Sequence, residues 1–342
     1  MSPSRTHLLF ANLCTIGLIV LYVNVRLNSE QQRNAQKTTS TDVGPRSNLI
    51  VIYNRIPKTG STTVTNAVAY DLYKINGFNV IHLNMTKNRQ VMSLTDQSEF
   101  VANITSWSER KPAFYHGHVA FVDFERFGIQ NPVYINIVRE PLERLLSHYY
   151  FLRFGDNFRV GLKRSRAGNN ETFDECVSRS GHDCDVKQMW LQIPYFCGHH
   201  HFCTVAGSKA ALDQAKKNLI DKYLIVGISE QIRDFIALLD RLVPRFFKGA
   251  LMHFDNLSEN RAHLRNTKQK YPPNDHTLSM IRRTEVYQLE KEFYEFAKDE
   301  FKAIFKKATN GTNNALDVLR LRLQFHYEKI KPERSMLNLN WS

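Results

Sequence analysis

The chain has 342 residues, of which 42% are hydrophobic and 23% are charged. This is the composition of a globular protein and not of a disordered one, and the length suits one large α/β domain or two small ones. The formal net charge of +13 indicates a polyanionic partner, which is nucleic acid, an anionic membrane or an acidic polysaccharide.

The N-terminus contains an apolar segment, residues 8–25, that carries no charge and follows Arg5 and His7. A transmembrane helix needs about 17–25 such residues, so this segment is just long enough to span a bilayer. A cleaved signal peptide is the alternative, but no Ala-x-Ala-like site follows, which favours a retained signal anchor. We therefore expect a cytoplasmic tail at 1–7, a transmembrane anchor at 8–25, a flexible polar stem at 26–48 and a lumenal domain at 49–342.

Sequons and cysteines support a lumenal location, which makes nucleic acid an unsuitable partner. Four cysteines follow the anchor, and an even number in an oxidising compartment indicates disulfides. They allow three pairings, among which the sequence alone cannot choose, and we expect the local pairs Cys176–Cys184 and Cys197–Cys203. N-glycosylation sequons occur at Asn84, Asn103, Asn170, Asn256, Asn310 and Asn340.

The folded region begins with an apolar β-branched run at 49–53, which predicts a buried strand. A loop with the sequence Pro-Lys-Thr-Gly-Ser-Thr follows, and apolar residues then recur at helical spacing up to Leu72. A loop between a strand and a helix presents backbone N–H groups and a positive helix end to an anion. Lys58 adds a charge, and the loop lacks the upstream glycine of a Walker A motif. An ordinary turn with a solvated lysine is the alternative.

Strands and helices then alternate, which predicts a parallel sheet covered by helices on both faces, an α/β fold. We expect further strands at 79–83, 113–119, 132–138 and 223–227. We expect helices at 100–107, 142–153, 213–219, 230–242, 275–308 and 315–325.

A second candidate anion site follows the strand at 132–138. Arg139 lies where that strand ends, Pro141 suits the first turn of the next helix, and Ser147 lies inside it. The planar fork of an arginine matches a phosphate group. An exposed Arg139–Glu140 pair is the alternative, but two anion sites at the ends of neighbouring strands favour a ligand with two phosphates.

Histidines supply the candidate chemistry. His116 and His118 flank Gly117, and an imidazole with a pKa near 6.5 can accept a hydroxyl proton at neutral pH. Two structural histidines at a strand end are one alternative. A metal-binding pair is another, but no third metal ligand lies at a recognisable spacing. The run 153–166 is basic, which is typical of a solvated face, a nucleic-acid patch or a rim that binds polyanions. A lumenal location disfavours nucleic acid and leaves sulfated or carboxylated sugars as the ligand of such a rim. The Cys-Gly-His-His-His-Phe-Cys run at 197–203 matches no usual zinc spacing, and a disulfide-closed loop is favoured.

Taken together, these motifs resemble the heparan sulfate 2-O-sulfotransferases, a family of Golgi carbohydrate sulfotransferases. The resemblance runs from about residue 49 to 330. It rests on Tyr-Asn-Arg-Ile-Pro-Lys-Thr at 53–59, Tyr-His-Gly-His at 115–118, Arg-Glu-Pro-Leu-Glu-Arg-Leu at 139–145, Tyr-Tyr-Phe-Leu-Arg-Phe-Gly-Asp at 149–156, Trp-Leu-Gln-Ile-Pro at 190–194, Pro-Arg-Phe-Phe at 244–247 and Phe-Tyr-Glu-Phe-Ala at 293–297.

The resemblance implies a P-loop-like sulfotransferase fold and a Golgi type II membrane enzyme, assembled as a homotrimer. It implies sulfate transfer from 3′-phosphoadenosine 5′-phosphosulfate to the 2-hydroxyl of hexuronic acid, mainly iduronate, in heparan sulfate, without a metal. His118 would be the general base, His116 would assist it or place the sugar, and Lys58 would steady the leaving phosphate. The other implied donor contacts are Thr59, Gly60, Ser61, Thr62, Arg139 and Ser147. The implied substrate contacts are Arg55, Asn66, Tyr70, Lys87, His116, Arg153, Arg159, Arg164, Arg265 and Lys329.

The resemblance also implies the two local disulfides. Ser165 interrupts the basic run that the family continues after Arg164, so we expect one substrate contact to be either missing or replaced by Arg166. Three other functions stay open. They are a uronyl 2-O-sulfotransferase that acts on dermatan or chondroitin sulfate, a non-catalytic lumenal protein that binds polyanions, and a P-loop kinase of glycans. The last is disfavoured because the Walker glycine and an obvious pair of Mg²⁺ carboxylates are missing.

Overall fold

The computed structural model describes residues 48–85, 91–157, 159, 161–258 and 267–309, which belong to a unit that begins at Asn48. Several predictions lie outside these residues: the anchor at 8–25, the helix at 315–325, the sequons at Asn310 and Asn340, and the substrate contacts Lys87, Arg265 and Lys329. Within the described ranges, no helix is both long enough and apolar enough to cross a membrane.

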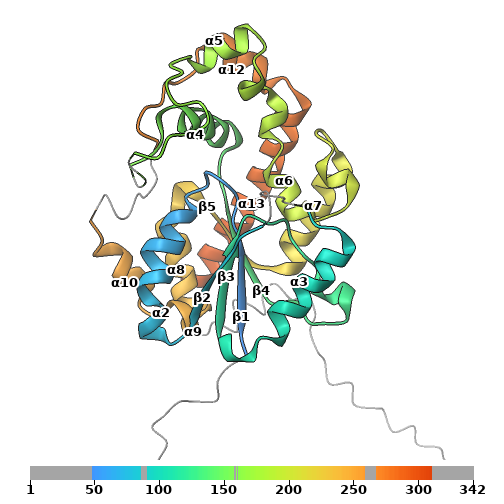
Figure 1. Cartoon of the computed structure of the whole chain (residues 1–342), viewed down its shortest axis with the longest axis vertical. Coiled ribbons are helices and arrows are strands. Elements are labelled where there is room, and N and C mark those ends of the chain that lie inside the picture. The colour runs from blue at the N-terminus through green and yellow to red at the C-terminus, as the bar shows by residue number, and fades with distance from the viewer. Residues whose placement is uncertain (1–47, 86–90, 158, 160, 259–266, 310–342) are drawn as a thin grey trace, which may run out of the picture. The chain divides into compact units, whose positions relative to one another are not determined.

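Five strands form one parallel sheet in the order β2-β3-β1-β4-β5 (Figure 1). They are β1 (Ile50–Asn54), β2 (Asn79–Leu83), β3 (Ala113–Gly117), β4 (Val133–Val138) and β5 (Tyr223–Ile228). Each lies where an apolar run predicts it, so the predicted parallel α/β fold is confirmed. The fully buried β1 is central, and the chain crosses it between β3 and β4. In such sheets ligands bind beyond the carboxyl ends of the strands, where the strand order reverses.

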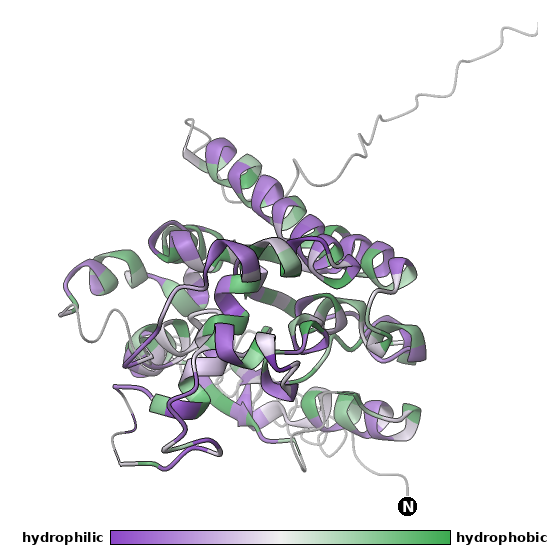
Figure 2. Cartoon of the chain, turned by 90° about the horizontal axis from the view of Figure 1, so that it is seen from above, coloured by the Kyte–Doolittle hydropathy of each residue, from purple (hydrophilic) through white to green (hydrophobic). Residues whose placement is uncertain are grey.

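Helices cover both faces of the sheet (Figure 1). One face carries the π-helix η1 (Thr63–Ala69), its continuation α2 (Tyr70–Asn76), α8 (Ile232–Leu242), α9 (Pro244–Phe247) and α10 (Ala250–Asp255). The other carries α3 (Leu94–Ser106), α6 (Gln192–Cys197) and α7 (Lys209–Lys222), while α13 (Glu285–Thr309) packs against β5 and α7. Hydrophobic and hydrophilic residues alternate along the helices (Figure 2), as is typical of helices that bury one side.

Short 3₁₀ turns connect these elements. They are η3 (Ser108–Arg110), η4 (Phe124–Phe127), η5 (His182–Cys184), η6 (Val186–Met189), η7 (His201–Thr204) and η8 (Ser229–Gln231).

A second, smaller hydrophobic cluster lies apart from the sheet core. It joins α4 (Pro141–Phe154), α5 (Phe173–Ser178), α12 (Asp275–Arg282) and the start of α13, which gather at one end of the unit in Figure 1. The single helix predicted at 275–308 is therefore wrong, because α12 ends at Arg282 and α13 begins at Glu285. Thr284 makes the break: its hydroxyl donates to Ile281 O and accepts from Tyr287 N.

Both predicted disulfides are present, Cys176–Cys184 and Cys197–Cys203. The second disulfide uses both cysteines that flank the His-His-His run, so they are not available to zinc. The four described sequon asparagines, Asn84, Asn103, Asn170 and Asn256, are all exposed, as glycan attachment requires.

Gly117 ends β3 and pairs with Asn54 on one side and Leu83 on the other. A Cβ atom there would lie 2.5 Å from the carbonyl oxygen of Leu83 and 2.6 Å from its Cβ. We expect Gly117→Ala to lower the free energy of unfolding by about 1–3 kcal/mol, the usual cost of overpacking, which urea denaturation measures. Adding Leu83→Gly should not restore stability, because the closest atom belongs to the backbone. An unchanged denaturation midpoint for Gly117→Ala would contradict this account.

Candidate active site

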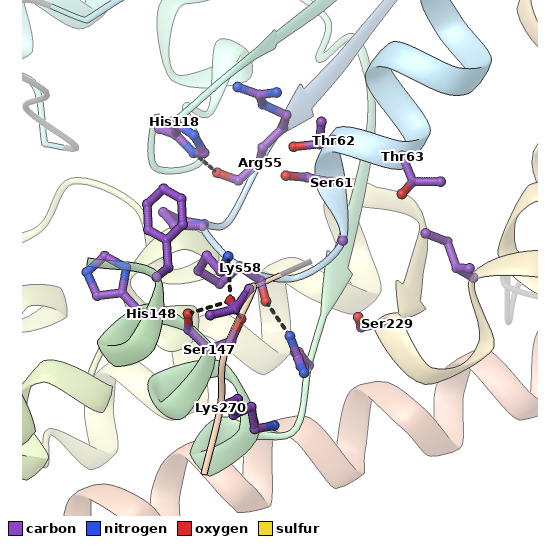
Figure 3. A pocket seen from close by; sticks show the side chains of 16 residues that line it. Arg55, Lys58, Ser61, Thr62, Thr63, His118, Ser147, His148, Ser229 and Lys270 are labelled. Atoms are coloured by element: carbon purple, nitrogen blue, oxygen red, sulfur yellow. Dashed lines mark hydrogen bonds between the residues drawn. The ribbon is translucent and has the colours of Figure 1, made fainter. Parts of the chain in front are cut away.

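A cavity of about 550 Å³ opens at the carboxyl ends of the strands (Figure 3). It brings together the lysine loop after β1, His118 after β3, and Arg139 with Ser147 after β4, as the sequence predicts. Its lining consists of Arg55, Pro57, Lys58, Gly60, Ser61, Thr62, Thr63, His118, Arg139, Ser147, His148, Phe151, Ser229, Ile232, Thr267 and Lys270. The lining is rich in cations and hydroxyl groups, which are suited to phosphate or sulfate.

Buried amides hold the end of β1 in place. Asn136 of β4 donates from Nδ2 to the backbone oxygen of Asn54 at 2.8 Å and to its Oδ1 at 2.9 Å. The Asn54 Oδ1 also accepts from the Tyr223 hydroxyl, and its Nδ2 donates to Tyr195 O. All four residues are buried, so the starting point of the lysine loop is fixed by neighbouring elements.

Lys58 lies in the middle of the cavity wall, between His118 and Ser147 (Figure 3). Its φ of 68° is unusual for a residue with a side chain, and such backbone strain is concentrated at functional sites. Its ammonium lies 4.3 Å from the centre of the Phe151 ring and donates to Thr267 Oγ1 at 3.4 Å. Arg139 Nη1 donates to Lys58 O at 3.3 Å, which joins the two predicted anion sites directly.

The other loop residues differ in what they offer a ligand. Gly60, Ser61 and Thr62 line the cavity, as predicted for donor contacts. Thr59 is fully buried, and its hydroxyl donates to Ile56 O within the loop. Its side chain therefore shapes the loop and does not face the cavity.

His148 is a cavity residue that sequence reasoning missed. It follows Ser147 on α4 and lines the cavity (Figure 3). Burial, assisted by the charges of Arg144 and Lys58, lowers its pKa to about 4, so it is neutral at physiological pH. The only signal in the sequence is its place one residue after Ser147.

The candidate base, His118, has a defined tautomer. Its Nδ1 lies 2.8 Å from the backbone oxygen of Arg55, and a carbonyl oxygen only accepts hydrogen bonds. Nδ1 therefore carries the hydrogen, and Nε2 is the basic atom of the neutral ring.

His116 has a different environment. It is 3% exposed, and its Nε2 lies 3.1 Å from the Tyr70 hydroxyl. Burial, followed by the charge of Arg55, lowers its pKa to about 3, so it stays neutral and serves as a hydrogen-bonding partner. His82 of β2 stacks on it, with ring centres 5.0 Å apart. Sequence reasoning missed His82, although strands of equal length in register would place it opposite His116.

Most of the predicted substrate contacts that the structure describes keep some exposed surface, whereas Arg153 does not. Arg55 lines the cavity, Tyr70 is 40% exposed beside His116, and Arg159 is exposed. Arg164 lies over the Phe151 ring at 4.3 Å and pairs with Asp156. Asn66 on η1 accepts from the Thr65 hydroxyl and is partly buried.

Arg153 is the exception, and its predicted role needs correction. Its side chain is 0% exposed, stacks on Tyr149 and pairs with Glu171 and Asp183. It therefore holds the protein together and is not presented to a polysaccharide. Arg166, expected to replace a substrate contact, instead donates twice to Asp183, at 2.8 and 3.0 Å, and anchors the basic loop.

Three histidines of lowered pKa predict loss of stability in acid. The pKa values of His116, His148 and His199 are lowered by burial to about 3, 4 and 4, against 6.5 in the unfolded chain. Between about pH 6.5 and 4.5 the unfolded chain binds these protons and the native chain does not, so unfolding becomes easier as the pH falls. Glu290 acts oppositely, because burial raises its pKa to about 7. The net difference of two protons predicts a slope of about 3 kcal/mol per pH unit.

Urea denaturation at pH 6.5 and 5.5 measures this slope. His199→Gln, which removes one titrating group, should reduce it by about 1.4 kcal/mol per pH unit. A free energy of unfolding that is constant over this range would refute the assignment.

Comparisons with known proteins agree with the site. The model of the sulfotransferase family matches residues 42–297. The heparan sulfate 2-O-sulfotransferase of Caenorhabditis elegans is 67% identical over 96% of this chain and 98% of its own length. The heparin sulfate O-sulfotransferase of Drosophila melanogaster is 49% identical over 86% of this chain and 82% of its own length. The heparan sulfate 2-O-sulfotransferase 1 of Homo sapiens is 49% identical over 83% of this chain and 79% of its own length. The chain therefore belongs to the sulfotransferase family.

Proposed function

We propose that this chain transfers sulfate from 3′-phosphoadenosine 5′-phosphosulfate to the 2-hydroxyl of hexuronic acid, mainly iduronate, in heparan sulfate. One observation carries the proposal: two anion-suited strand ends and a histidine of defined tautomer border the same cavity. The polymer and the position of the sulfate are inferred from the relatives, which are heparan sulfate 2-O-sulfotransferases. The net charge of +13 suits an acidic polymer.

The donor fits the cavity because it carries negative charge at both ends. Lys58 with Ser61 and Thr62 would hold the 5′-phosphosulfate, and Arg139 with Ser147 would hold the 3′-phosphate. Thr267 contacts both Lys58 and Ser147, so it lies between the two groups. Lys270 lines the same cavity and pairs with Glu143.

In the proposed reaction, Nε2 of His118 accepts the proton of the 2-hydroxyl while the hydroxyl oxygen attacks sulfur. The bond between sulfur and the 5′-phosphate oxygen breaks, and that oxygen leaves with the electron pair. Lys58 stabilises the charge that builds up on the departing phosphate, so side-chain cations supply the stabilisation and we propose a metal-independent transfer. Neutral His116 and the Tyr70 hydroxyl would position the sugar.

We further propose that the enzyme is a single-pass type II protein of the Golgi membrane, glycosylated and assembled as a homotrimer. The exposed sequons and the two disulfides support a lumenal domain. Cell fractionation, glycosidase treatment and light scattering of the purified protein test these three points.

Incubation with labelled donor and either N-sulfated heparosan or chondroitin tests the function, and disaccharide analysis locates the new ester. We expect 2-O-sulfated hexuronic acid in the heparosan-derived chains. Label only in chondroitin would favour a uronyl 2-O-sulfotransferase of dermatan or chondroitin sulfate. Retention on a heparin column without transfer of label would favour a non-catalytic polyanion-binding protein.

A further inference from the structure

Gln192 is a buried amide behind the wall of the donor cavity. It begins α6 and is 0% exposed, and it does not line the cavity itself. A buried amide is costly unless each of its polar atoms finds a partner, so the partners indicate what it does.

Both ends of this amide bind the backbone of one residue. The Gln192 Oε1 accepts from Arg139 N at 2.9 Å, and its Nε2 donates to Arg139 O at 2.9 Å. Arg139 lies between the end of β4 and the start of α4, one residue beyond the last residue of β4 that is paired with β5. Two hydrogen bonds to one residue fix the direction in which its side chain leaves the chain.

Glu290 of α13 holds Gln192 in turn. It is 0% exposed, and its Oε1 accepts from Leu191 N at 2.9 Å and from Ile193 N at 3.2 Å, the two neighbours of Gln192. Its Oε2 accepts from Gln192 Nε2 at 3.3 Å. Burial raises the pKa of Glu290, while the nearby guanidinium of Arg144 opposes that rise.

We propose that Gln192, held by Glu290, is a positioning residue that aims Arg139 at the 3′-phosphate end of the donor cavity and thereby sets the affinity for the nucleotide. This inference rests on the proposed function, because it names how the donor is held. It makes α13, far along the chain, a determinant of donor binding. Arg139 Nη1 also donates to Lys58 O, so a displacement of the Arg139 backbone would also displace the lysine loop.

The test is binding of adenosine 3′,5′-bisphosphate by calorimetry, with kinetics for both substrates. Gln192→Leu removes both hydrogen bonds to Arg139, and we expect the Kd to rise about tenfold. The KM for the donor should rise in parallel, while the KM for the polysaccharide stays within about twofold because the groups near His118 are untouched.

Asn218→Leu is the matched control. Asn218 is also a buried amide, and its Nδ2 donates to Phe196 O and Cys197 O at the other end of α6. Both variants should unfold at lower urea concentrations, but Asn218→Leu should bind the bisphosphate within about twofold of the unsubstituted chain, because it does not contact Arg139.

Glu290→Gln is the second variant, used if Gln192→Leu does not fold. It can keep a carbonyl oxygen for Leu191 N and Ile193 N but places an amide against the Gln192 amide, so we expect about threefold weaker binding. If Gln192→Leu or Glu290→Gln binds the bisphosphate with the same Kd as the unsubstituted chain, the inference is overturned and the proposed function is left intact. If the unsubstituted chain does not bind the bisphosphate, the proposed function itself fails.

Discussion

Replacement of His118 by glutamine is expected to reduce turnover by about 10²–10⁴-fold, the usual contribution of a general base. Glutamine is polar and of similar reach, but it has no basic nitrogen to take the proton of the sugar hydroxyl. Donor binding should change little, because the two anion-suited groups lie around Lys58 and Arg139. Steady-state kinetics give the turnover, and calorimetry with adenosine 3′,5′-bisphosphate gives the binding.

The control is His201→Gln, which changes an exposed histidine outside the cavity and should leave turnover unchanged. The pH profile adds a second readout, because a limb due to titration of His118 should disappear in His118→Gln. His116 cannot supply that limb at neutral pH, since burial holds its pKa at about 3. Near-normal turnover by His118→Gln would remove this residue from the role of base.

Replacement of Lys58 by methionine is expected to lower kcat/KM for the donor by about 10²–10³-fold, the usual cost of losing one group that stabilises charge in a transition state. Methionine keeps most of the apolar stem against Phe151 but loses the ammonium. Because the ammonium would act on the leaving phosphate, kcat should fall more than the affinity for the polysaccharide. Initial rates at varied donor concentration measure both effects.

Two further variants interpret that result. Lys268→Met removes an exposed lysine that does not line the cavity and should behave as the unsubstituted chain. Lys58→Arg keeps the charge on a backbone with a φ of 68°, but it replaces the compact ammonium by a planar fork. We therefore expect kcat/KM to lie between that of Lys58→Met and that of the unsubstituted chain. If Lys58→Met stays within threefold of the unsubstituted chain, another group must stabilise the leaving phosphate.

Much of the fold can be predicted because its strands are apolar runs bounded by turn residues. All five strands lie within about two residues of their predicted positions, and Pro141 begins α4 as expected. The helix boundaries are less well predicted where a cap was overlooked. Ser93 and Asp96 form a capping box that starts α3 six residues before the predicted helix, and Thr284 separates α12 from α13. Both signals are visible in the sequence.

Some residues of the candidate site can be predicted from the sequence and others cannot. Lys58, Arg139, Ser147 and His118 each follow a strand, so the parallel sheet alone brings them to one edge. The place of His82 follows only when β2 and β3 are also aligned in register, and that of Gln192 depends on packing between distant helices, which the sequence does not reveal. The type of a residue is also insufficient. Arg153 is among the predicted polysaccharide contacts, yet Glu171 and Asp183 neutralise it inside the protein.

Under the proposed function, the central position of β1 separates the side of the site that would hold the nucleotide from the side that would hold the sugar. The nucleotide side is built from the β1 loop, the end of β4 and α4, whereas the imidazoles of His82, His116 and His118 come from the ends of β2 and β3. A substitution at the ends of β2 and β3 is therefore expected to change which sugar is accepted without changing how the nucleotide donor is bound. Proteins of this fold can therefore keep the sulfate-transfer reaction while the polysaccharide that accepts the sulfate changes.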